Sequence, residues 1–341
     1  MDYEIINIIN NIPQLLPLGL IGLYRWLIWG IKKILGLFYR PVKVSKYNIK
    51  QLKQKVSVIV PVYNESEETF RTALLSWISE KPYEIIAVID FTDNKSIEIF
   101  KNFQQTYKSI HTKLIVTKKP GKREALYDGL QVAKGDIYAL VDSDSIWTKG
   151  ILNTAKATFQ SNKMIGGVMT RQNVLKPTSL AEKIFDMLLD IRAHDEQPML
   201  TAWGNNVLCL SGRTAFYRST ALKPYIDDLV NDYFLGEKII SGDDKRLTEI
   251  IQKNGYNAVF QSNMQIYTVA EKKLSTFAKQ RIRWARNTVR YSMRAIFNGW
   301  VLKHPMMTFV IIDGLISKFT LLFGAFLIIQ MMLDQKFIAV A

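Results

Sequence analysis

Short apolar runs alternate with helix-like stretches between residues 56 and 141, and this alternation restricts the fold more than any other feature of the sequence. The apolar runs are rich in β-branched residues, as strands are. We expect four strands, at Val56 to Val62, Glu84 to Asp90, Lys113 to Thr117 and Asp136 to Val141. Helices are expected between them, at Ser66 to Ser79, Lys95 to Tyr107 and Lys122 to Ala133. Strict alternation predicts an α/β fold with a mostly parallel sheet and helices on both of its faces.

The second half of the chain has a looser pattern. We expect helices near Ile151 to Gln160, Leu180 to His194, Asp243 to Lys253 and Lys273 to Phe297, and a strand around Val207 to Ser211. The helices at 180–194 and 273–297 are amphipathic. The sequence therefore divides into an N-terminal transmembrane or interfacial helix at 1–40, an α/β domain at 41–272, an amphipathic interface helix at 273–303 and a C-terminal transmembrane segment at 304–341.

Two segments are apolar enough to suggest a membrane, which requires about 20 apolar residues for a span. The first, Ile12 to Phe38, is interrupted by three basic residues, so a span is favoured but an interfacial helix remains open. The second, Met306 to Leu333, is interrupted only by Asp313 and Lys318 and predicts a span. Charges are costly in lipid, so these two side chains are expected either to pair or to be covered by other helices.

The basic flanks of both segments place the part between them on the cytoplasmic side of a cell membrane. Cys209 is the only cysteine, which excludes an intramolecular disulfide and suits that location. The chain ends in an apolar stretch at 337–341, as expected of a chain cut short or of an unusually short protein of its kind.

The charge balance points to anionic partners. The formal net charge is +15, which suits nucleic acid, anionic membrane lipids or a phosphorylated substrate. The sequence contains no helix-turn-helix signature, zinc-finger spacing or aromatic RNA-binding motif. We therefore expect membrane lipids and phosphorylated substrates as partners, and no nucleic acid.

Polar residues follow the expected strands, at the sheet edge where ligands bind in α/β folds. Tyr63 and Glu65 follow the first strand, and Asp90 ends the second, where it can accept a hydrogen bond from a base or ribose or can simply form a turn. Asp142 and Asp144 follow the fourth strand, one residue apart. These two carboxylates can hold one Mg²⁺ or Mn²⁺ ion beside substrate phosphates, or can cap a turn.

Two further motifs suggest phosphate and proton chemistry. The basic turn KKPGKREAL enters a helix whose N-terminus, with Lys122 and Arg123, favours phosphate, although a solvated basic surface explains it as well. Asp243 and Asp244 begin another helix, where they can act as caps or supply a general base.

One face of the long basic helix carries Gln280, Arg283 and Trp284 at i, i+3 and i+4. A guanidinium here can clamp a diphosphate, and an indole can stack on a sugar ring. The alternative is an amphipathic helix that lies on an anionic membrane, which fits the neighbouring arginines at 281, 286, 290 and 294.

Taken in order, PVYNE, Asp90, KPGKREAL, DSD, SGR, GDDKR and QRIRW resemble family 2 glycosyltransferases of the Rossmann-like GT-A fold. The resemblance covers about Lys55 to Met293 and is strongest to the processive membrane synthases of hyaluronan, cellulose and chitin. It implies metal-dependent, inverting transfer of a sugar from a UDP-sugar to a growing polysaccharide. Two alternatives remain: addition of one sugar to a lipid or lipid-linked acceptor, and an inactive scaffold that binds nucleotide or lipid.

The resemblance also implies a role for each matching residue. Asp90 contacts the uracil with Tyr63 packed beside it, and Lys122 lies near the nucleotide. Asp142 and Asp144 hold the ribose and the metal ion, with Asp144 the firmer ligand. The remaining roles are the catalytic base for Asp244, the diphosphate contact for Arg283, and the acceptor contacts for Gln280 and Trp284.

Three departures from the family pattern bear on these roles. Arg213 follows Ser211 and Gly212 where hyaluronan synthases tend to carry Ser-Gly-Pro, so the acceptor pocket is expected to differ. Asp90 is followed by Phe91 and Thr92 in place of an acidic and a small residue. Two expected spans are also too few for a polymer-conducting pore, which a homo-oligomer would have to complete.

Overall fold

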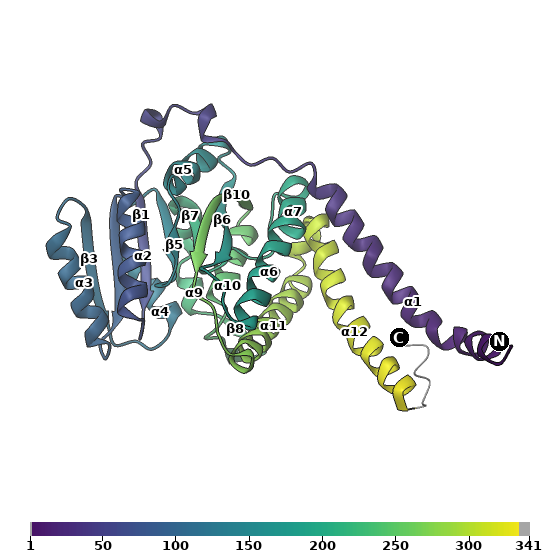
Figure 1. Ribbon diagram of the computed structural model, residues 1–341. Helices are drawn as coiled ribbons and strands as arrows, with labels where there is room; N and C mark the ends of the chain where they lie inside the picture. The colour runs from purple at the N-terminus through teal and green to yellow at the C-terminus, as the bar shows by residue number, and fades with distance from the viewer. Residues whose placement is uncertain (1, 334–341) are drawn as a thin grey trace.

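The computed structural model describes residues 2–333, which form a mixed α/β domain with an arm of two long helices (Figure 1). The arm consists of α1 (Asp2–Gly36) and α12 (Pro305–Leu333), which come from opposite ends of the chain. The C-terminal end of α1 and the N-terminal end of α12 lie against the same side of the domain. The apolar stretch at 337–341 lies outside the described residues.

An eight-stranded sheet with the order β3-β2-β1-β4-β7-β6-β10-β5 forms the centre of the domain. The first four of these strands are parallel, as are β6 and β10, whereas β7 is antiparallel to both of its neighbours and β5 is antiparallel to β10. The sheet is therefore mixed but mostly parallel, as the alternation predicts. The strand bounds are β1 Val56–Val62, β2 Glu84–Asp90, β3 His111–Thr117, β4 Ile137–Val141, β5 Ile146–Trp147, β6 Ile165–Val174, β7 Thr214–Arg218 and β10 Asn257–Thr268.

Helices cover both faces of this sheet and enclose a separate apolar core on each side. On one face, Trp77, Phe100 and Phe159 are fully buried and belong to α2 (Glu67–Ser79), α3 (Asn94–Thr106) and α5 (Ile151–Ser161). On the other face, Leu126 and Ile250 belong to α4 (Lys122–Val132) and α10 (Asp243–Lys253). These helices agree with the expected ones to within two residues at either end.

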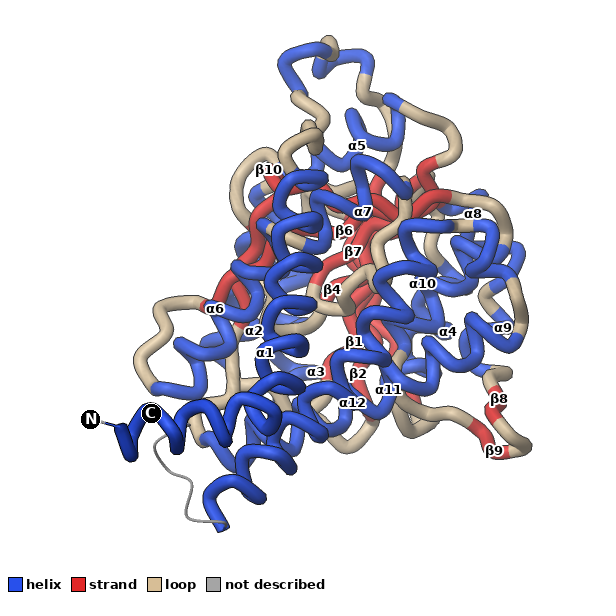
Figure 2. The backbone as a smooth tube through the Cα atoms, turned by 90° about the vertical axis from the view of Figure 1, so that its right-hand side faces the viewer, coloured by secondary structure: helices blue, strands red, loops and turns tan. Residues whose placement is uncertain are grey.

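Three helices join the domain to the arm: α6 (Leu180–His194), α7 (Glu196–Gly204) and α11 (Leu274–Phe297). A shared apolar cluster holds α7 and α11 against the start of α12, with Leu200, Tyr291 and Ile311 among its buried members. Figure 2 shows α11 and α12 next to each other at this junction. The short elements are α8 Ser219–Leu222, α9 Asp227–Val230, the hairpin strands β8 Tyr233–Phe234 and β9 Glu237–Lys238, and 3-10 turns at Val44–Lys46, Ile49–Gln51, Lys223–Tyr225 and Trp300–Lys303.

The expectation of a strand at Val207 to Ser211 is wrong. This segment is an irregular connection between α7 and β7, and the strand of this region begins three residues later, at Thr214. One backbone bond joins the segment to β10, from the Val207 amide to the Ala258 carbonyl at 2.7 Å, but no strand pairing continues beyond it. The Leu210 amide instead donates to the Thr248 hydroxyl, and Gln252 donates to the Val207 carbonyl. Val207, Cys209 and Leu210 are buried.

The charges within the arm pair across it. Asp313 of α12 is buried and accepts hydrogen bonds from Arg25 at 2.8 Å, Lys32 at 2.7 Å and the Tyr24 hydroxyl at 3.0 Å, all on α1. Asp313 and Lys318 therefore do not pair with each other, because α1 supplies the partners of the carboxylate. The ammonium of Lys318 instead donates to the Gly314 carbonyl of its own helix.

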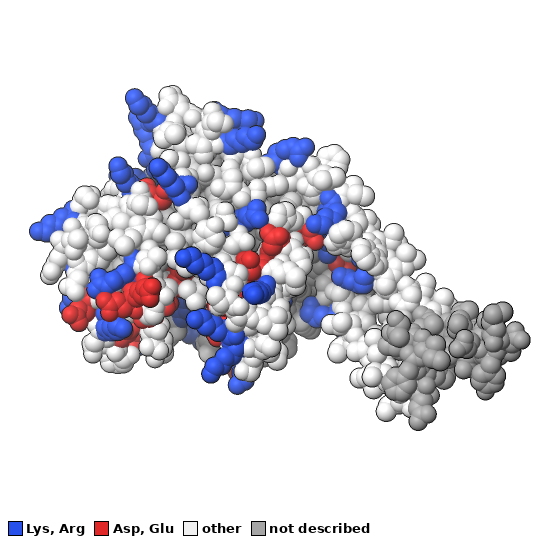
Figure 3. Space-filling view, viewed as in Figure 1, with Lys and Arg blue, Asp and Glu red and all other residues white. Residues whose placement is uncertain are grey.

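Among the described helices, α12 is the one that is long and apolar enough to cross a membrane. Most of the surface of α12 is not covered by other parts of the protein. Many apolar side chains in the second half of α1 are likewise exposed. Figure 3 shows Lys and Arg side chains spread over the domain, whereas the described part of the arm carries little charge on this face. A spanning segment at the C-terminal end is thus supported, and a second one in α1 stays a prediction.

The ion pairs of Asp313 predict a stability effect. Asp313→Asn leaves two cations facing a neutral amide, and we expect the free energy of unfolding to fall by about 1–3 kcal/mol. The effect is limited because Arg25 is partly exposed, so solvent screens its charge. Thermal unfolding of the detergent-solubilised protein should show a lower melting temperature. Ser317→Ala is the matched control, since the Ser317 hydroxyl bonds only to its own helix. An unchanged melting temperature for Asp313→Asn would contradict the role of this cluster.

Candidate active site

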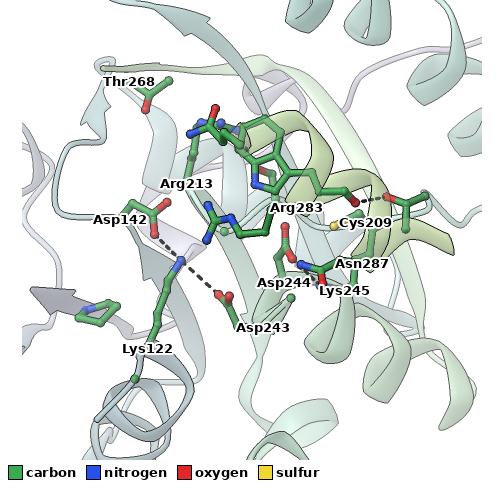
Figure 4. A pocket seen from close by; sticks show the side chains of 18 of the residues that line it. Lys122, Asp142, Cys209, Arg213, Asp243, Asp244, Lys245, Thr268, Arg283 and Asn287 are labelled. Atoms are coloured by element: carbon green, nitrogen blue, oxygen red, sulfur yellow. Dashed lines mark hydrogen bonds and ion pairs between the residues drawn. The ribbon is translucent and has the colours of Figure 1, made fainter. Parts of the chain in front are cut away.

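A large cavity of about 1300 Å³ opens at the carboxyl ends of the parallel strands and continues to α12. Figure 4 shows its centre, where side chains from α4, β4, α10 and α11 converge. The structure brings together the expected site residues other than Glu65 and Arg123 in the lining of this cavity: Tyr63, Asp90, Lys122, Asp142, Asp144, Arg213, Asp243, Asp244, Gln280, Arg283 and Trp284.

Lys122 links the two acidic motifs at the centre of the cavity. Its ammonium lies 2.6 Å from Asp142 and 3.1 Å from Asp243, so it bridges the end of β4 and the start of α10. Burial opposes the charge of Lys122, but the two carboxylates outweigh burial and raise its pKa. Gly212 allows this close packing, because a Cβ atom there would lie 3.0 Å from the lysine nitrogen. Lys122 thus remains a cation at the centre of the cavity.

Asp142 and Asp144 have different surroundings, although both are disfavoured as anions. Burial raises the pKa of each carboxyl, and each also has a neighbouring carboxylate, Asp144 beside Asp142 and Glu65 beside Asp144. Asp144 accepts hydrogen bonds from the Thr268 hydroxyl at 2.8 Å and the Val269 amide at 3.2 Å, which fix its orientation. Both residues are half-buried, and a bound cation would offset the repulsion between neighbouring carboxylates there.

The residues present fit a divalent ion that takes two ligands from the protein and the others from water and substrate phosphates. Within the part of the chain that the structure describes, no three His, Cys, Asp or Glu side chains gather as a complete metal cage. Mg²⁺ is commonly held by one or two carboxylates plus substrate phosphates and water. The Asp142 and Asp144 pair supplies that number of protein ligands.

The start of α10 is held in place from behind. Gly242 precedes the helix with a φ of +76°, and Asp243 and Asp244 follow it into the cavity. Arg123 donates to the carbonyls of Ser241 and Gly242 and to Asp232 from the opposite side. The expectation that Arg123 adds charge to a phosphate site is therefore wrong: its side chain is 5% exposed and faces the interior. Lys122 and Arg123 are neighbours in a helix, so their side chains point in different directions.

Asp243 and Asp244 also differ from each other. Asp243 pairs with Lys122, whose charge outweighs burial and lowers the pKa of this carboxyl. One oxygen of Asp244 accepts from the Lys245 amide at 2.8 Å, and the carboxylate forms no ion pair with any residue that the structure describes. Asp244 is thus the one of the two carboxylates that has no ion-pair partner among the described residues.

Arg213 lies against two aromatic rings that also pack on each other, with 5.7 Å between the ring centroids of Phe185 and Trp284. Its guanidinium lies 4.8 Å from the ring centroid of Phe185 and 5.2 Å from that of Trp284, and it donates to Gln172 at 3.1 Å. Such stacking suits the planar guanidinium. The departure from the family pattern at Arg213 therefore places a cation against the face of Trp284 that is expected to meet an acceptor sugar.

The expected nucleotide end of the cavity is more open. Tyr63 is 70% exposed at the rim, so its ring is free to pack on a ligand. Asp90 accepts from the hydroxyl and amide of Thr92, and these bonds lower the pKa of its carboxyl. Glu65 does not line the cavity; it accepts from the Ser143 hydroxyl at 2.9 Å and so braces the loop between the two aspartates.

Several cavity residues were not expected from the sequence. Thr268 orients Asp144, and Asn287 bonds to Ser241 beside Gly242. Asn287 lies one turn beyond Arg283 on α11, so helical spacing could have found it. Thr268 ends a strand far along the chain, and no local signal marks it. Arg192, Lys245 and Lys318 also line the cavity.

Cys209 lies in the wall of this cavity and should resist alkylation. Burial raises the pKa of its thiol from 9.0 to about 12, which lowers the thiolate fraction about 1,000-fold at neutral pH. We expect iodoacetamide to label the native protein far more slowly than glutathione, and to label it readily after unfolding in guanidinium. Mass spectrometry measures both rates. Native labelling at the rate of glutathione would show that the thiol is open to solvent.

Comparison with known proteins agrees with this architecture. The chain belongs to the family described as "Glycosyltransferase like family 2", whose pattern matches residues 53–287, and it is thus a transferase. The N-acetylglucosaminyltransferase of Azorhizobium caulinodans is 27% identical over 252 residues, 72% of this chain and 62% of that protein. The hyaluronan synthase of Streptococcus pyogenes serotype M3 is 25% identical over 285 residues, 81% of this chain and 65% of that protein. The chain matches less than two thirds of the length of either relative.

A solved structure shares the fold over almost the whole chain. The mannosyltransferase of Pyrobaculum calidifontis, in complex with GDP-mannose and Mn²⁺, superimposes with a TM-score of 0.65 and 19% sequence identity. The superposition covers 96% of this chain and 86% of the mannosyltransferase. The GT-A-like fold expected from the motifs is thereby confirmed.

Proposed function

We propose that this protein catalyses the inverting transfer of a sugar from a UDP-sugar to a hydroxyl of a growing polysaccharide at the cytoplasmic face of a membrane. The observation that carries the proposal is the convergence of Asp142, Asp144, Lys122 and Asp244 in one cavity. The family assignment and relatives named for N-acetylglucosamine transfer and hyaluronan synthesis support it.

The proposed reaction is a single displacement at the anomeric carbon. The acceptor hydroxyl oxygen attacks this carbon and gives its proton to the carboxylate of Asp244. The bond from the anomeric carbon to the β-phosphate oxygen breaks at the same time, and UDP leaves with the bonding electrons. Attack from the side opposite the leaving group inverts the anomeric configuration, without a covalent enzyme intermediate.

Cationic groups would stabilise the departing diphosphate. Lys122 is held as a cation between Asp142 and Asp243, and Arg283 reaches the same cavity from α11. Asp142 and Asp144 would hold Mg²⁺ or Mn²⁺, which when bound neutralises negative charge on the phosphates. Asp90 and Tyr63 would contact the uracil and Gln280 and Trp284 the acceptor.

A second candidate is the addition of a single sugar to a lipid or lipid-linked acceptor. It is favoured by the extension of the cavity to α12, the described helix that can cross a membrane. Both candidates use the same chemistry, and they differ in the acceptor and in the length of the product.

A donor screen with product sizing tests the proposal. The detergent-solubilised protein is incubated with Mn²⁺ and UDP-glucose, UDP-N-acetylglucosamine, UDP-glucuronate or UDP-galactose, and UDP release is measured. We expect selective release with one or two donors, and long products on a gel. Short or lipid-bound products would favour the second candidate. Absence of turnover with every donor, from protein that is folded and that binds UDP, would contradict the proposal and favour an inactive scaffold.

A further inference from the structure

The cavity is larger than one nucleotide-sugar requires. Sites for a single small molecule usually measure about 300–1,000 Å³, whereas this cavity measures about 1300 Å³. The carboxylates described above lie between its two ends. Tyr63, Asp90 and Lys118 line one end, and residues of α12 line the other. When a donor occupies the end lined by Tyr63 and Asp90, the volume of the cavity leaves the α12 end free for a second ligand.

A stripe of α12 faces this second end. Val310, Ile311, Gly314 and Lys318 line the cavity, and they recur at the spacing of one helix face. A Cβ atom added at Gly314 would meet no atom within 4 Å, so open space adjoins the helix here. The facing wall on α11 is formed by small or polar side chains, namely those of Ala285, Thr288 and Ser292. The start of α12 packs directly on α11, so an extended molecule can lie farther along α12, beside Gly314 and Lys318.

Three cations line the same cavity without a carboxylate partner. Arg192 of α6, Lys245 of α10 and Lys318 of α12 form no ion pair with any residue in the described range 2–333. The ammonium of Lys245 lies 5.1 Å from the ring centroid of Tyr291 on α11. Glu196 also lines the cavity and is not paired with any of the three. Unpaired cations that face one cavity are complementary to an anion.

Lys318 is the most unusual of these residues because of its helix. The other charge within α12, Asp313, is neutralised by α1, but the ammonium of Lys318 bonds only to the Gly314 carbonyl. Neighbouring residues of α12 expose large apolar side chains, including Phe319 at 73% and Leu321 at 73%. An unpaired lysine within an apolar, membrane-type helix marks a functional site by default.

We propose that the α12 end of the cavity binds the phosphate group of a lipid-linked acceptor. The phosphate lies among Arg192, Lys245 and Lys318, and the hydrocarbon chain leaves along the apolar surface of α12 into the membrane. Asp244 lines the same cavity, and a sugar or other hydroxyl group attached to that phosphate would extend toward this base. This inference rests on the proposed function for the donor side, and it applies whether one sugar or many are added.

Binding of farnesyl phosphate to the whole protein in detergent tests the site. Farnesol carries the same chain without charge, and inorganic phosphate carries the charge without a chain. We expect farnesyl phosphate to bind at least about tenfold more tightly than either probe, since both parts contribute. Equal binding of farnesol, or equal competition by inorganic phosphate, would overturn the proposal as unspecific apolar binding or an adventitious ion only. Displacement by equimolar phosphatidylglycerol would overturn it in favour of a bulk-lipid site.

Variants of Lys318 locate the phosphate and separate the two proposals. Lys318→Gln should weaken farnesyl phosphate binding about tenfold, and Lys318→Arg should restore most of it. Lys303→Gln removes an exposed lysine outside the cavity and should leave binding unchanged. UDP binding should be the same in all four proteins. Intact farnesyl phosphate binding in Lys318→Gln overturns this site alone, whereas failure of the wild type to bind UDP overturns the proposed function alone.

Discussion

Asp244→Asn is expected to reduce sugar transfer by about 10²–10⁴-fold, the usual contribution of a general base. The carboxylate lines the centre of the cavity at the start of α10 and has no cation bound to it, unlike Asp243. An amide of the same shape cannot accept the hydroxyl proton. Because Asp244 is not assigned to the donor, UDP binding should be unchanged. Initial rates of UDP release and calorimetric UDP binding measure the two effects.

A matched control keeps this result specific. Glu271→Gln removes an exposed carboxylate that lies outside the cavity, and it should retain the full rate. The circular dichroism spectrum and melting temperature of Asp244→Asn should match those of the wild type. Full transfer activity in a folded Asp244→Asn protein would assign the base to another residue, with Asp243 the first to examine.

The second large effect is expected for Asp144→Asn. The substitution keeps an oxygen for the Thr268 hydroxyl, whose bond to Asp144 measures 2.8 Å, but removes the charge that would hold a divalent ion. Loss of a metal contact worth several kcal/mol corresponds to a rate lowered by two or more powers of ten. We expect UDP release to fall by at least about 100-fold at low Mn²⁺, with partial recovery at higher Mn²⁺.

The dependence of the rate on Mn²⁺ concentration tests whether Asp144 is a metal ligand. Thr268→Val removes the hydrogen bond and retains the carboxylate, so it should raise the Mn²⁺ requirement less than Asp144→Asn does. UDP binding without metal should be the same in both variants. An Asp144→Asn protein with a normal rate and a normal Mn²⁺ requirement would remove Asp144 from the metal site.

Local sequence patterns predicted most of the elements of this fold. The apolar runs of β1 and β2 match the structure residue for residue, and the helices at Leu180–His194 and Asp243–Lys253 begin and end where their patterns do. A serine cap with Glu182 three residues later fixes the start of the first of these helices. Such signals depend on neighbouring residues, which is why the sequence alone reveals them.

Tertiary packing decided what the sequence could not show. The apolar run at Val207 to Ser211 predicts a strand, but it makes only one backbone bond to β10, and side chains of α10 bond the rest of its backbone. Arg123 belongs to a basic turn, yet carbonyls and Asp232 from three later segments surround it. The partners of Asp313 lie on α1, more than 280 residues away. None of these contacts leaves a local trace.

The candidate site shows the same division. Strand ends and the motif order predicted that Asp90, Asp142 and Asp144 would share one sheet edge with Lys122, and all four line the cavity. The contact of Arg213 with the rings of Phe185 and Trp284 depends on where α6 and α11 dock, which no spacing in the sequence specifies. The extension of the cavity to α12 was hidden for the same reason.

The anomeric configuration of the product tests the central claim most directly. The wild-type protein is given its preferred UDP-α-sugar, Mn²⁺ and an acceptor, and the new linkage is assigned by nuclear magnetic resonance while UDP is counted. A single displacement through Asp244 predicts a β-linkage, with one UDP released for each sugar transferred and no transfer after chelation of the metal. An α-linked product, or transfer that persists unchanged without a divalent ion, would contradict the account.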